Sequence, residues 1–588
     1  MAELSLEGKK GSVKPIIKRR EVINNDAALF KNIHPVLRQV YLNRGLNCDD
    51  QLDRTLKKLP SYQHLLGIDT AVDIIKRAIA GNEKIVIVAD FDADGATSCT
   101  VAIRGLRLLG AQQVDFVVPD RFKFGYGLTP EIVDVALALK PALIITVDNG
   151  VSSVDGVAYA RSKGCQVVVT DHHLPPKQLP QADAIVNPQL VGDLFPSKAL
   201  AGVGVIFYVL LAVRAALQND GYFVKQAAPN LANLLDIVAL GTVADVVPMD
   251  EVNRKLVHQG LLRIQSGKCV PGIQALLKVA KRQSERVVAS DLGFAIGPRL
   301  NAAGRLDDMS LGIECLLTDD PQQAESLAEQ LDMLNIERRA IEDDMKLDAF
   351  KILAALKLNN ITQQQWGVCL FDEHWHQGVI GILASRIKDK LNRPVIAFAQ
   401  ANDEEIKGSA RSIAGLHIRD VLDDIASQYP QLLKKFGGHA MAAGMTLAAK
   451  DYSVFCQVFD LAVKKRLNGV EPNHVLFVDG EIADGDINLA LAETLRQGGP
   501  WGQNFPEPVF EGIFKVKNAR IVGQKHVKLE LETSTKRRKL DAIYFNPDNP
   551  DALIGLACVK LVYQLDINEY MGRSSVQLMV RHMESTEA

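Results

Sequence analysis

Short β-branched runs alternate with stretches of helical spacing from residue 84 onward, and this alternation constrains the fold more than any other feature of the chain. The runs are KIVIVAD, VDFVVPD, ALIITVD, CQVVVTD and ADAIVNP, and the stretches between the first four include ATSCTVAIRGLRLLG and PEIVDVALALK. A series of this kind predicts an α/β domain with a mostly parallel, doubly wound sheet. Ligands of such sheets bind beyond the carboxyl ends of the strands.

Acidic residues and histidines stand at those carboxyl ends. They are Asp90, Asp92 and Asp94 after the first run, Asp148 after the third, and Asp171, His172 and His173 after the fourth. A further acid, Asp245, follows another apolar stretch, ALGTVADVVP. Because parallel strands end at one edge of a sheet, we expect these side chains to form one cluster of carboxylates and imidazoles without a thiolate.

Such a cluster is unstable without a cation, because like charges repel. Carboxylates with one or two histidines suit Mn²⁺ or Mg²⁺, and two such ions can hold a phosphodiester and activate water. We expect Asp148 to bridge the ions, His172 to be a direct ligand, and His173 to meet a phosphate or orient the water. The alternative is that each acid caps a helix or a turn, and DADG alone fits a turn. The joint pattern at successive strand ends favours the metal site. The isolated His34 and His417 are expected to be structural.

Composition limits the partners and the compartment. The net charge of −3 means that an acidic polymer would have to bind in local basic grooves. The eight cysteines include no CxxC pair, so a thiolate zinc site is not expected, and their scatter favours reduced thiols in the cytoplasm. We find neither the apolar core of a signal peptide nor a run expected to span a bilayer.

The pattern changes along the chain predict five segments. They are a helical N-terminal preface (1–80), the α/β domain with the acids (81–320), a long connecting helix (321–360), a second, smaller α/β domain (361–465), and a small β-barrel of OB type (470–585). Asp320 and Pro321 fit the start of the connecting helix.

With these residues in place, the chain resembles the DHH phosphoesterase superfamily and, within it, the RecJ family of bacterial single-stranded-DNA exonucleases. The motifs DFDADGATS, TVDNG, TDHHLP and GTVADVVP carry the resemblance in order. It implies that residues 81–320 are a DHH catalytic domain and residues 361–465 a DHHA1 domain that grips substrate. It also implies that two ions, Mn²⁺ or Mg²⁺, are held by Asp92, Asp94, Asp148, His172 and Asp245. Asp90 either is a ligand of one ion or supports one. Asp148, His172 and His173 carry over as the catalytic residues.

The resemblance further implies a set of residues that bind the substrate and its 5′ phosphate. They are Arg121, Arg299, Asn301, Arg305, His376, Arg386, Ser409, Arg411 and His439. The planar guanidinium of Arg matches phosphate oxygens. The chain departs from the family pattern at Asp120, Lys123 and Phe124, and at Ala410, where a glycine is usual. If the usual glycine adopts a positive φ at this position, the alanine at 410 would strain the loop.

The barrel resembles the OB domain of long RecJ proteins, which implies stacking of bases on aromatic residues along a basic groove. The candidates are Phe514, Lys515, Lys517, Arg520, Lys525 and Lys528, with the basic TKRRK at residues 535–539 as either a DNA contact or a solvated turn.

The implied function is a metal-dependent 5′→3′ exonuclease that hydrolyses single-stranded DNA to nucleotides in DNA repair and homologous recombination, including resection and mismatch-repair excision. The implied partners are single-stranded DNA, single-stranded-DNA-binding protein and a RecQ-type helicase, with no membrane. We expect a monomer. Two alternatives stay open: a DHH phosphodiesterase acting on short oligonucleotides, and a non-catalytic DNA-binding replication factor.

Overall fold

The computed structural model describes residues 15–21, 29–120, 123–124, 127–358, 365–472, 474–523, 525–533, 538–547, 549–570 and 572–586. The chain divides into two compact units, a larger one that joins Arg19–Leu334 with Phe477–Ala588 and a smaller one built around Asn335–Leu476. The long helix α13 (Pro321–Leu358) runs from the first into the second, close to the expected bounds of the connecting helix. The Asp320 carboxylate accepts the Gln322 N–H at its start, as expected for a capping residue.

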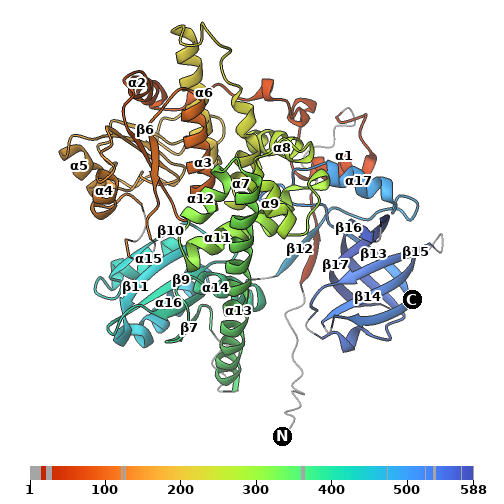
Figure 1. Ribbon diagram of the computed structural model, residues 1–588. Coiled ribbons are helices and arrows are strands. Elements are labelled where there is room, and N and C mark those ends of the chain that lie inside the picture. The colour runs from red at the N-terminus through yellow and green to blue at the C-terminus, as the bar shows by residue number, and fades with distance from the viewer. Residues whose placement is uncertain are drawn as a thin grey trace. The chain divides into compact units, whose positions relative to one another are not determined.

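The α/β part of the larger unit is a five-stranded parallel sheet (Figure 1). Its order is β3-β2-β4-β5-β6. The strands are β2 (Ile85–Ala89), β3 (Val114–Val117), β4 (Leu143–Val147), β5 (Gln166–Thr170) and β6 (Ala184–Val186). The four helices nearest to them in sequence are α2 (Ile68–Ala80), α3 (Ala93–Leu108), α4 (Pro130–Leu137) and α5 (Val154–Ser162). The predicted doubly wound fold is therefore confirmed.

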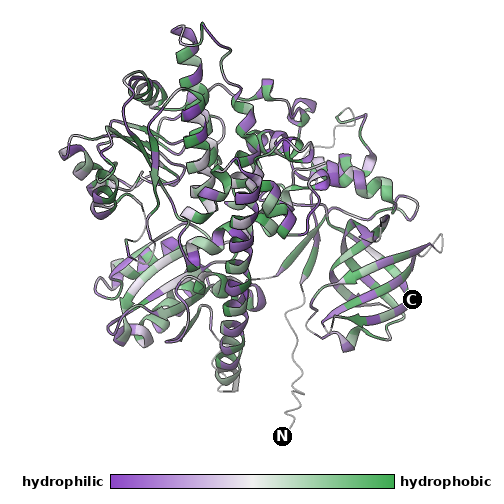
Figure 2. Cartoon of the chain, viewed as in Figure 1, coloured by the Kyte–Doolittle hydropathy of each residue, from purple (hydrophilic) through white to green (hydrophobic). Residues whose placement is uncertain are grey.

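Alternate residues of the central strands serve two separate cores. Ile85 and Ile87 of β2 pack in the core that includes α3, whereas Val86 and Val88 pack in the core that includes α4 and α5. Both faces of the sheet are covered by helices, which explains why its strands read as continuous apolar runs. Figure 2 shows the same strands in mostly hydrophobic colours.

The larger unit contains further helices, several of which contact α3. They are α1 (Pro35–Asn43), α6 (Gly202–Asn219), α7 (Leu235–Ala244), α8 (Glu251–Gln265), α9 (Pro271–Val279), α10 (Ala289–Asp291), α11 (Gly297–Leu306), α12 (Ser310–Leu317) and α17 (Leu489–Gln497). The expected helical preface contains α1 and α2 but also the strand β1 (Ile16–Arg19), which pairs with β12 (Val475–Val478).

One of these helices corrects an expectation. We expected no apolar run able to span a bilayer, yet among the described residues α6 is long and apolar enough to do so by length and composition. Of that stretch, 67% is buried inside the protein, where α6 packs against α2 and α3. Burial of this kind is typical of a core helix.

The smaller unit has a mixed five-stranded sheet with order β10-β11-β9-β8-β7, in which only β7 and β8 are parallel. The strands are β7 (Val368–Asp372), β8 (Val395–Gln400), β9 (Glu405–Arg411), β10 (Lys435–Gly438) and β11 (Ala442–Ala448). The helices after α13 are α14 (Ile380–Leu391), α15 (Ile418–Gln428) and α16 (Tyr452–Arg466). This agrees with the predicted second α/β domain.

The C-terminal strands form a closed barrel with order β13-β14-β15-β17-β16, in which β15 and β17 are parallel. They are β13 (Phe510–Val522), β14 (His526–Thr533), β15 (Lys539–Tyr544), β16 (Cys558–Tyr570) and β17 (Arg573–Ser585). Phe514 lies inside this barrel, 2% exposed and edge-on to Tyr563, so its predicted role in stacking DNA bases is wrong. Residues 535–537 of TKRRK lie outside the described residues.

Candidate metal centre

The loop between β2 and α3 carries the first three acids. Asp92 is the N-cap of α3, and its Oδ1 accepts the N–H groups of Asp94 and Gly95 at 2.9 and 3.0 Å. The capping alternative thus holds for Asp92, and capping fixes the loop rather than excluding a ligand role. Asp90 and Asp94 are buried on either side of it.

The Asp94 carboxylate lies at the start of α6. Its Oδ2 accepts the Gly202 N–H at 2.6 Å and its Oδ1 accepts the Val203 N–H at 3.0 Å. The first N–H groups of a helix have no partner within the helix, and the helix dipole favours a negative charge there. This interaction, which the local sequence does not reveal, holds one carboxylate of the cluster between α3 and α6.

Asp148 follows β4 in a left-handed backbone conformation, with φ of 61°, and is 2% exposed. A non-glycine residue with positive φ is uncommon, and aspartate adopts this conformation more readily than most residues. The next residue, Asn149, donates from its side-chain amide to the carbonyl oxygens of Val88 and Val147 at 3.1 and 2.9 Å. This amide ties the end of β4 to β2, so the acids of the two strands are held at one edge of the sheet.

Asp171 shapes the turn that presents the two histidines, as expected. Its Oδ1 accepts the N–H groups of His172 and His173 at 2.7 and 3.1 Å, and lies 2.7 Å from His173 Nδ1. Burial opposes charge on both partners, but their contact lowers the pKa of Asp171 to about 2 and raises the pKa of His173 to about 9. His173 is therefore a cation at neutral pH in the metal-free protein.

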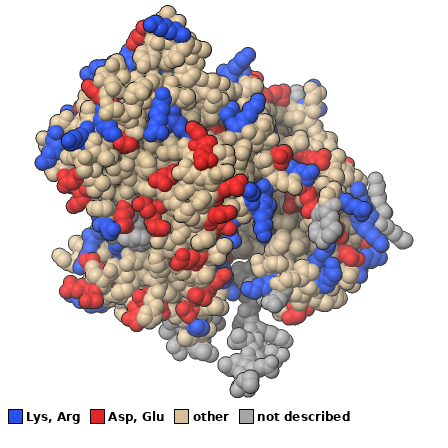
Figure 3. All heavy atoms as spheres, viewed as in Figure 1, with Lys and Arg blue, Asp and Glu red and all other residues tan. Residues whose placement is uncertain are grey.

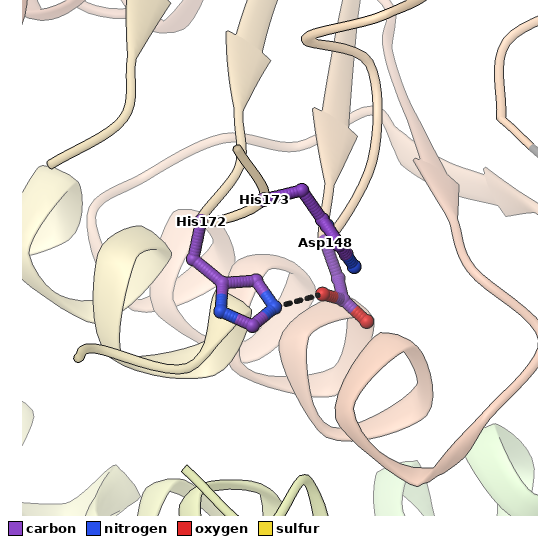
Figure 4. Close-up of side chains that lie close together, drawn as sticks. All are labelled: Asp148, His172 and His173. Carbon is purple, nitrogen blue, oxygen red and sulfur yellow. Dashed lines mark ion pairs between the residues drawn. The ribbon is translucent and has the colours of Figure 1, made fainter. Parts of the chain in front are cut away.

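His172 lies at the centre of the cluster. Its Nε2 is 3.1 Å from Asp148 Oδ1, 3.5 Å from Asp245 Oδ2 and 3.9 Å from Asp94 Oδ2, and Figure 4 shows the imidazole and the Asp148 carboxylate pointing toward one another. Asp245 is the C-cap of α7, so the apolar stretch before it is a helix. The C-terminal end of α7 therefore places Asp245 in the same cluster as the acids at the ends of the strands.

Among the described residues, three sets of side chains have ligand atoms within 4.8 Å of one another. They are Asp148, His172 and His173; Asp94, His172 and Asp245; and Asp90, Asp92 and Asp148. Asp148 and His172 each belong to two sets. Oxygen donors with one or two imidazole nitrogens and no thiolate fit Mn²⁺ or Mg²⁺. Two neighbouring sets that share members fit two ions with a common ligand.

Burial and mutual repulsion disfavour the charged form of these carboxyls. Burial and then the charge of Asp92 raise the pKa of Asp94 to about 7. Burial, followed by the neighbouring aspartates, raises the pKa values of Asp148 and Asp245 well above their usual range. A bound cation would reverse this effect, because an opposite charge favours the ionised carboxylate.

Mn²⁺ binding is therefore expected to release protons and to tighten as the pH rises from about 6 to about 8. Below pH 7 Asp94 is mostly protonated, so the cation must displace its proton, whereas above pH 7 that competition disappears. Calorimetric titration of metal-free protein, in buffers with different heats of ionisation, would count the protons released. An affinity that is constant over this range would contradict the expectation.

The structure gives several predicted substrate residues partners within the protein. Arg299 Nη2 lies 2.7 Å from an oxygen of Asp332, and the side-chain oxygen of Asn301 accepts the N–H of Ala93 at 2.9 Å. Arg305 lies on the same helix, α11. Arg121 lies outside the described residues. The Asn301 hydrogen bond joins α11 to the loop that carries the acids.

In the smaller unit, the predicted substrate residues Ser409 and Arg411 lie together. Arg411 Nη1 is 3.2 Å from Ser409 Oγ, and a Cβ on Gly381, in the first turn of α14, would lie within 3 Å of both side chains. Arg386 instead donates to Glu342 at 2.8 Å. The ring of His376 accepts the Gly378 N–H at 3.1 Å, and the backbone N–H of His439 donates to Ala442.

The departures from the family pattern are accommodated. Ala410 lies within the strand β9 with its side chain fully buried, and it is not among the residues with positive φ, so the expected strain is absent there. Lys123 Nζ lies 3.3 Å from a carboxylate oxygen of Asp120, which offsets the added negative charge. His34 and His417 cap α1 and α15, in agreement with their predicted structural roles.

Comparison with known proteins places this site in a family. Family models match the DHH family N-terminal domain at residues 84–242, the DHHA1 domain at 361–465 and the RecJ OB domain at 478–582. The single-stranded-DNA-specific exonuclease RecJ of Dickeya dadantii is 51% identical over 572 residues, covering 96% of this chain and 98% of that protein. The chain belongs to the RecJ family. The RecJ of Escherichia coli is 48% identical over 96% of this chain and 98% of its own length.

A solved RecJ structure supports the fold of both units. The RecJ of Thermus thermophilus in complex with Mn²⁺ matches with a TM-score of 0.77 and 28% identity, over 95% of this chain and 77% of that chain. A second structure of that RecJ is a complex with Mg²⁺. Both ions are those that the donor set of the present site fits.

Proposed function

We propose that this chain is a metal-dependent exonuclease that hydrolyses single-stranded DNA from the 5′ end to nucleotides. The observation that carries the proposal is the sharing of Asp148 and His172 between neighbouring sets of ligands. Two divalent ions in such a site suit phosphodiester hydrolysis. The RecJ relatives are named single-stranded-DNA-specific exonucleases, which supports the choice of substrate.

Each residue of the cluster has a distinct role in this proposal. Asp94, His172 and Asp245 would hold one ion and Asp90 and Asp92 the other, while Asp148, which belongs to one set with His172 and to another with Asp90 and Asp92, would be their common ligand. Mn²⁺ or Mg²⁺ held there would supply a Lewis acid and a water molecule of lowered pKa for phosphodiester hydrolysis. His173, whose Nδ1 lies 2.7 Å from Asp171 Oδ1, is oriented by that carboxylate and would donate a hydrogen bond to a phosphate oxygen.

The direction of cleavage rests on the resemblance to RecJ and on the smaller unit. Ser409 and Arg411 lie together at the first turn of α14, where a helix N-terminus favours an anion. The substrate set predicted from the sequence also contains Arg121, Arg299, Asn301, Arg305, His376, Arg386 and His439, of which Asn301 uses its side-chain oxygen within the protein. A terminal 5′ phosphate carries more charge than an internal one, so such a group of donors would select a chain end.

The barrel is proposed to extend the grip on the DNA strand. Lys515, Arg520 and Lys525 are exposed on or beside β13, whereas Lys517 and Lys528 pair with Glu532 and Asp541. In the view of Figure 3, Lys and Arg side chains gather over the surface of the barrel. Exposed Lys and Arg side chains bind DNA phosphates without distinguishing base sequence.

We place this activity in DNA repair and recombination in the cytoplasm, as the resemblance implies. The 81–320 segment is proposed as the catalytic domain, 361–465 as the substrate-gripping domain and 470–585 as the DNA-binding barrel. Single-stranded-DNA-binding protein and a RecQ-type helicase are the proposed protein partners, and the chain is proposed to act as a monomer.

The test is degradation of one single-stranded DNA, labelled at the 5′ or the 3′ end, by wild-type and His172→Ala protein with Mn²⁺. We expect the 5′ label to appear first as mononucleotide and the substitution to abolish its release, because His172 belongs to two sets of ligands. His64→Ala, at an exposed histidine of the same unit, is the matched control and should remain active. Release from the 3′ end would overturn the polarity, and binding without cleavage by wild type would place the chain among non-catalytic proteins.

A further inference from the structure

Helix α11 touches the loop that carries three of the acids. The side-chain oxygen of Asn301 accepts the N–H of Ala93 at 2.9 Å. Ala93 stands between Asp92 and Asp94 and is the first residue of α3. Its N–H is one of the helix N–H groups that have no partner within the helix, so Asn301 satisfies a donor that the local sequence leaves open.

The same helix contacts the loop a second time, one turn further along. A Cβ on Gly304 would lie 1.8 Å from the carbonyl oxygen of Phe91, closer than any side chain allows. Glycine therefore permits the backbone of α11 to lie directly against the loop. Phe91 and Ala93 flank Asp92, so α11 contacts the backbone on both sides of this acid.

The two contacts complete the support of the loop. Asp92 accepts the N–H groups of Asp94 and Gly95, and Asn301 accepts that of Ala93, so two side chains satisfy three successive N–H groups. The position of Ala93 sets where Asp92 and Asp94 point. In the structure, Asn301 acts through its oxygen, whereas a phosphate would require its amide N–H groups.

We propose that Asn301 is a positioning residue that sets the spacing of the carboxylates and thereby the metal affinity, rather than a ligand of the DNA phosphate. The inference rests on the metal site of the proposed function. Partners that orient metal ligands typically contribute about 10–100-fold to metal affinity.

Two substitutions separate the two roles. Asn301→Ala removes both the oxygen and the amide, and we expect the dissociation constant for Mn²⁺ to rise about tenfold or more. Asn301→Asp keeps an oxygen for the Ala93 N–H but has no N–H for a phosphate and repels it. We expect Asn301→Asp to retain at least about a third of the wild-type Mn²⁺ affinity, because the hydrogen bond remains.

The measurements are Mn²⁺ titration calorimetry without DNA and cleavage of 5′-phosphorylated and 5′-hydroxyl strands. Positioning predicts that the ratio of the two KM values in Asn301→Ala stays within about twofold of wild type, since no phosphate contact is lost. Asn233→Ala, at an exposed asparagine of the same unit, is the matched control and should change neither readout.

The outcomes distinguish this inference from the proposed function. Wild-type cleavage tests the proposed function, whereas Mn²⁺ binding without DNA tests Asn301 whether or not DNA is cut. Wild-type Mn²⁺ affinity in Asn301→Ala would overturn the inference. So would Mn²⁺ binding by Asn301→Asp as weak as that of Asn301→Ala, or a changed KM ratio with unchanged metal affinity. Both variants change the same site. A general folding defect would therefore lower the thermal unfolding temperature of Asn301→Ala and Asn301→Asp by similar amounts.

Discussion

The Asp148→Asn protein is expected to bind single-stranded DNA without cleaving it and, in the absence of metal, to be more stable than wild type. Asp148 belongs to two of the three sets of ligands, so its loss should reduce cleavage by about 1,000-fold or more. Asparagine is the suitable replacement because it tolerates the left-handed backbone at φ of 61° and has nearly the same shape.

The gain in stability has a definite sign and pH dependence. Burial, followed by the charges of Asp94, Asp92, Asp90 and Asp245, raises the pKa of Asp148 well above its usual range. A carboxyl whose pKa is raised on folding lowers the free energy of unfolding as the pH rises above the pKa of the unfolded chain. Asp148→Asn should therefore increase the free energy of unfolding by about 1–2 kcal/mol at neutral pH and by little at pH 4.

Thermal unfolding in the presence of a chelator, at neutral and at acidic pH, checks the predicted gain in stability. Cleavage of labelled DNA checks the predicted loss of activity. Asp73→Asn, at an exposed aspartate of α2, provides the same chemical change outside the cluster and should alter neither quantity. Cleavage by Asp148→Asn at the wild-type rate would show that the Asp148 carboxylate is not a required metal ligand. Reduced stability in the chelator would show that the carboxylate is held by favourable contacts rather than by a cation.

The site could be predicted to the extent that local pattern determines it. The apolar runs before Asp90, Asp148 and Asp171 predict parallel strands, and parallel strands bring their ends to one edge. That reasoning needs no partner distant in sequence. It also extends to Asp171, because the hydrogen bonds that its carboxylate accepts from the N–H groups of the next two residues are local.

The contacts that the sequence does not reveal depend on distant partners. Asn301 and Ala93 are 208 residues apart, and Arg299 meets Asp332 on another helix, so the sequence around GPRLNAAGR gives no sign of either contact. A motif rich in Arg and Asn is equally suited to phosphate and to internal acceptors. Only the packing of α11 decides between them.

Phe514 illustrates a second limit. Alternate residues of a strand face opposite sides, so local pattern places Phe514 on one of two faces. Which face becomes the interior depends on how the barrel closes. Closure is set by the pairing of β13 with both β14 and β16 and by an irregularity in register between Val516 and Asn518. The alternation of Phe514 and Val516 with Lys515 and Lys517 indicates an apolar face, but it does not show that this face lies inside a closed barrel.

Gly202→Ala is expected to reduce both cleavage and stability, although alanine favours a helix more than glycine does. Gly202 is the first residue of α6, and a Cβ there would lie 2.7 Å from the Cβ of Asp148 and 2.8 Å from its Oδ1. The N–H of Gly202 also donates to Asp94, so the clash would disturb two acids of the cluster together. Forcing extra volume into a packed site costs about 1–3 kcal/mol, which exceeds the gain of about 1 kcal/mol from helix propensity.

The matched control is Gly204→Ala, two residues further along the same helix. A Cβ on Gly204 would meet the end of the Leu200 side chain at 3.2 Å, away from the carboxylates. Chemical denaturation should show a lower free energy of unfolding for Gly202→Ala than for Gly204→Ala, and cleavage at saturating Mn²⁺ should fall about tenfold or more only in the former. If both variants cleaved DNA like wild type, the close approach of α6 to Asp148 would have no part in placing that carboxylate. A loss seen only at limiting Mn²⁺ would contradict this expectation, because it would mean that the clash weakens metal binding without lowering cleavage once the metal is bound.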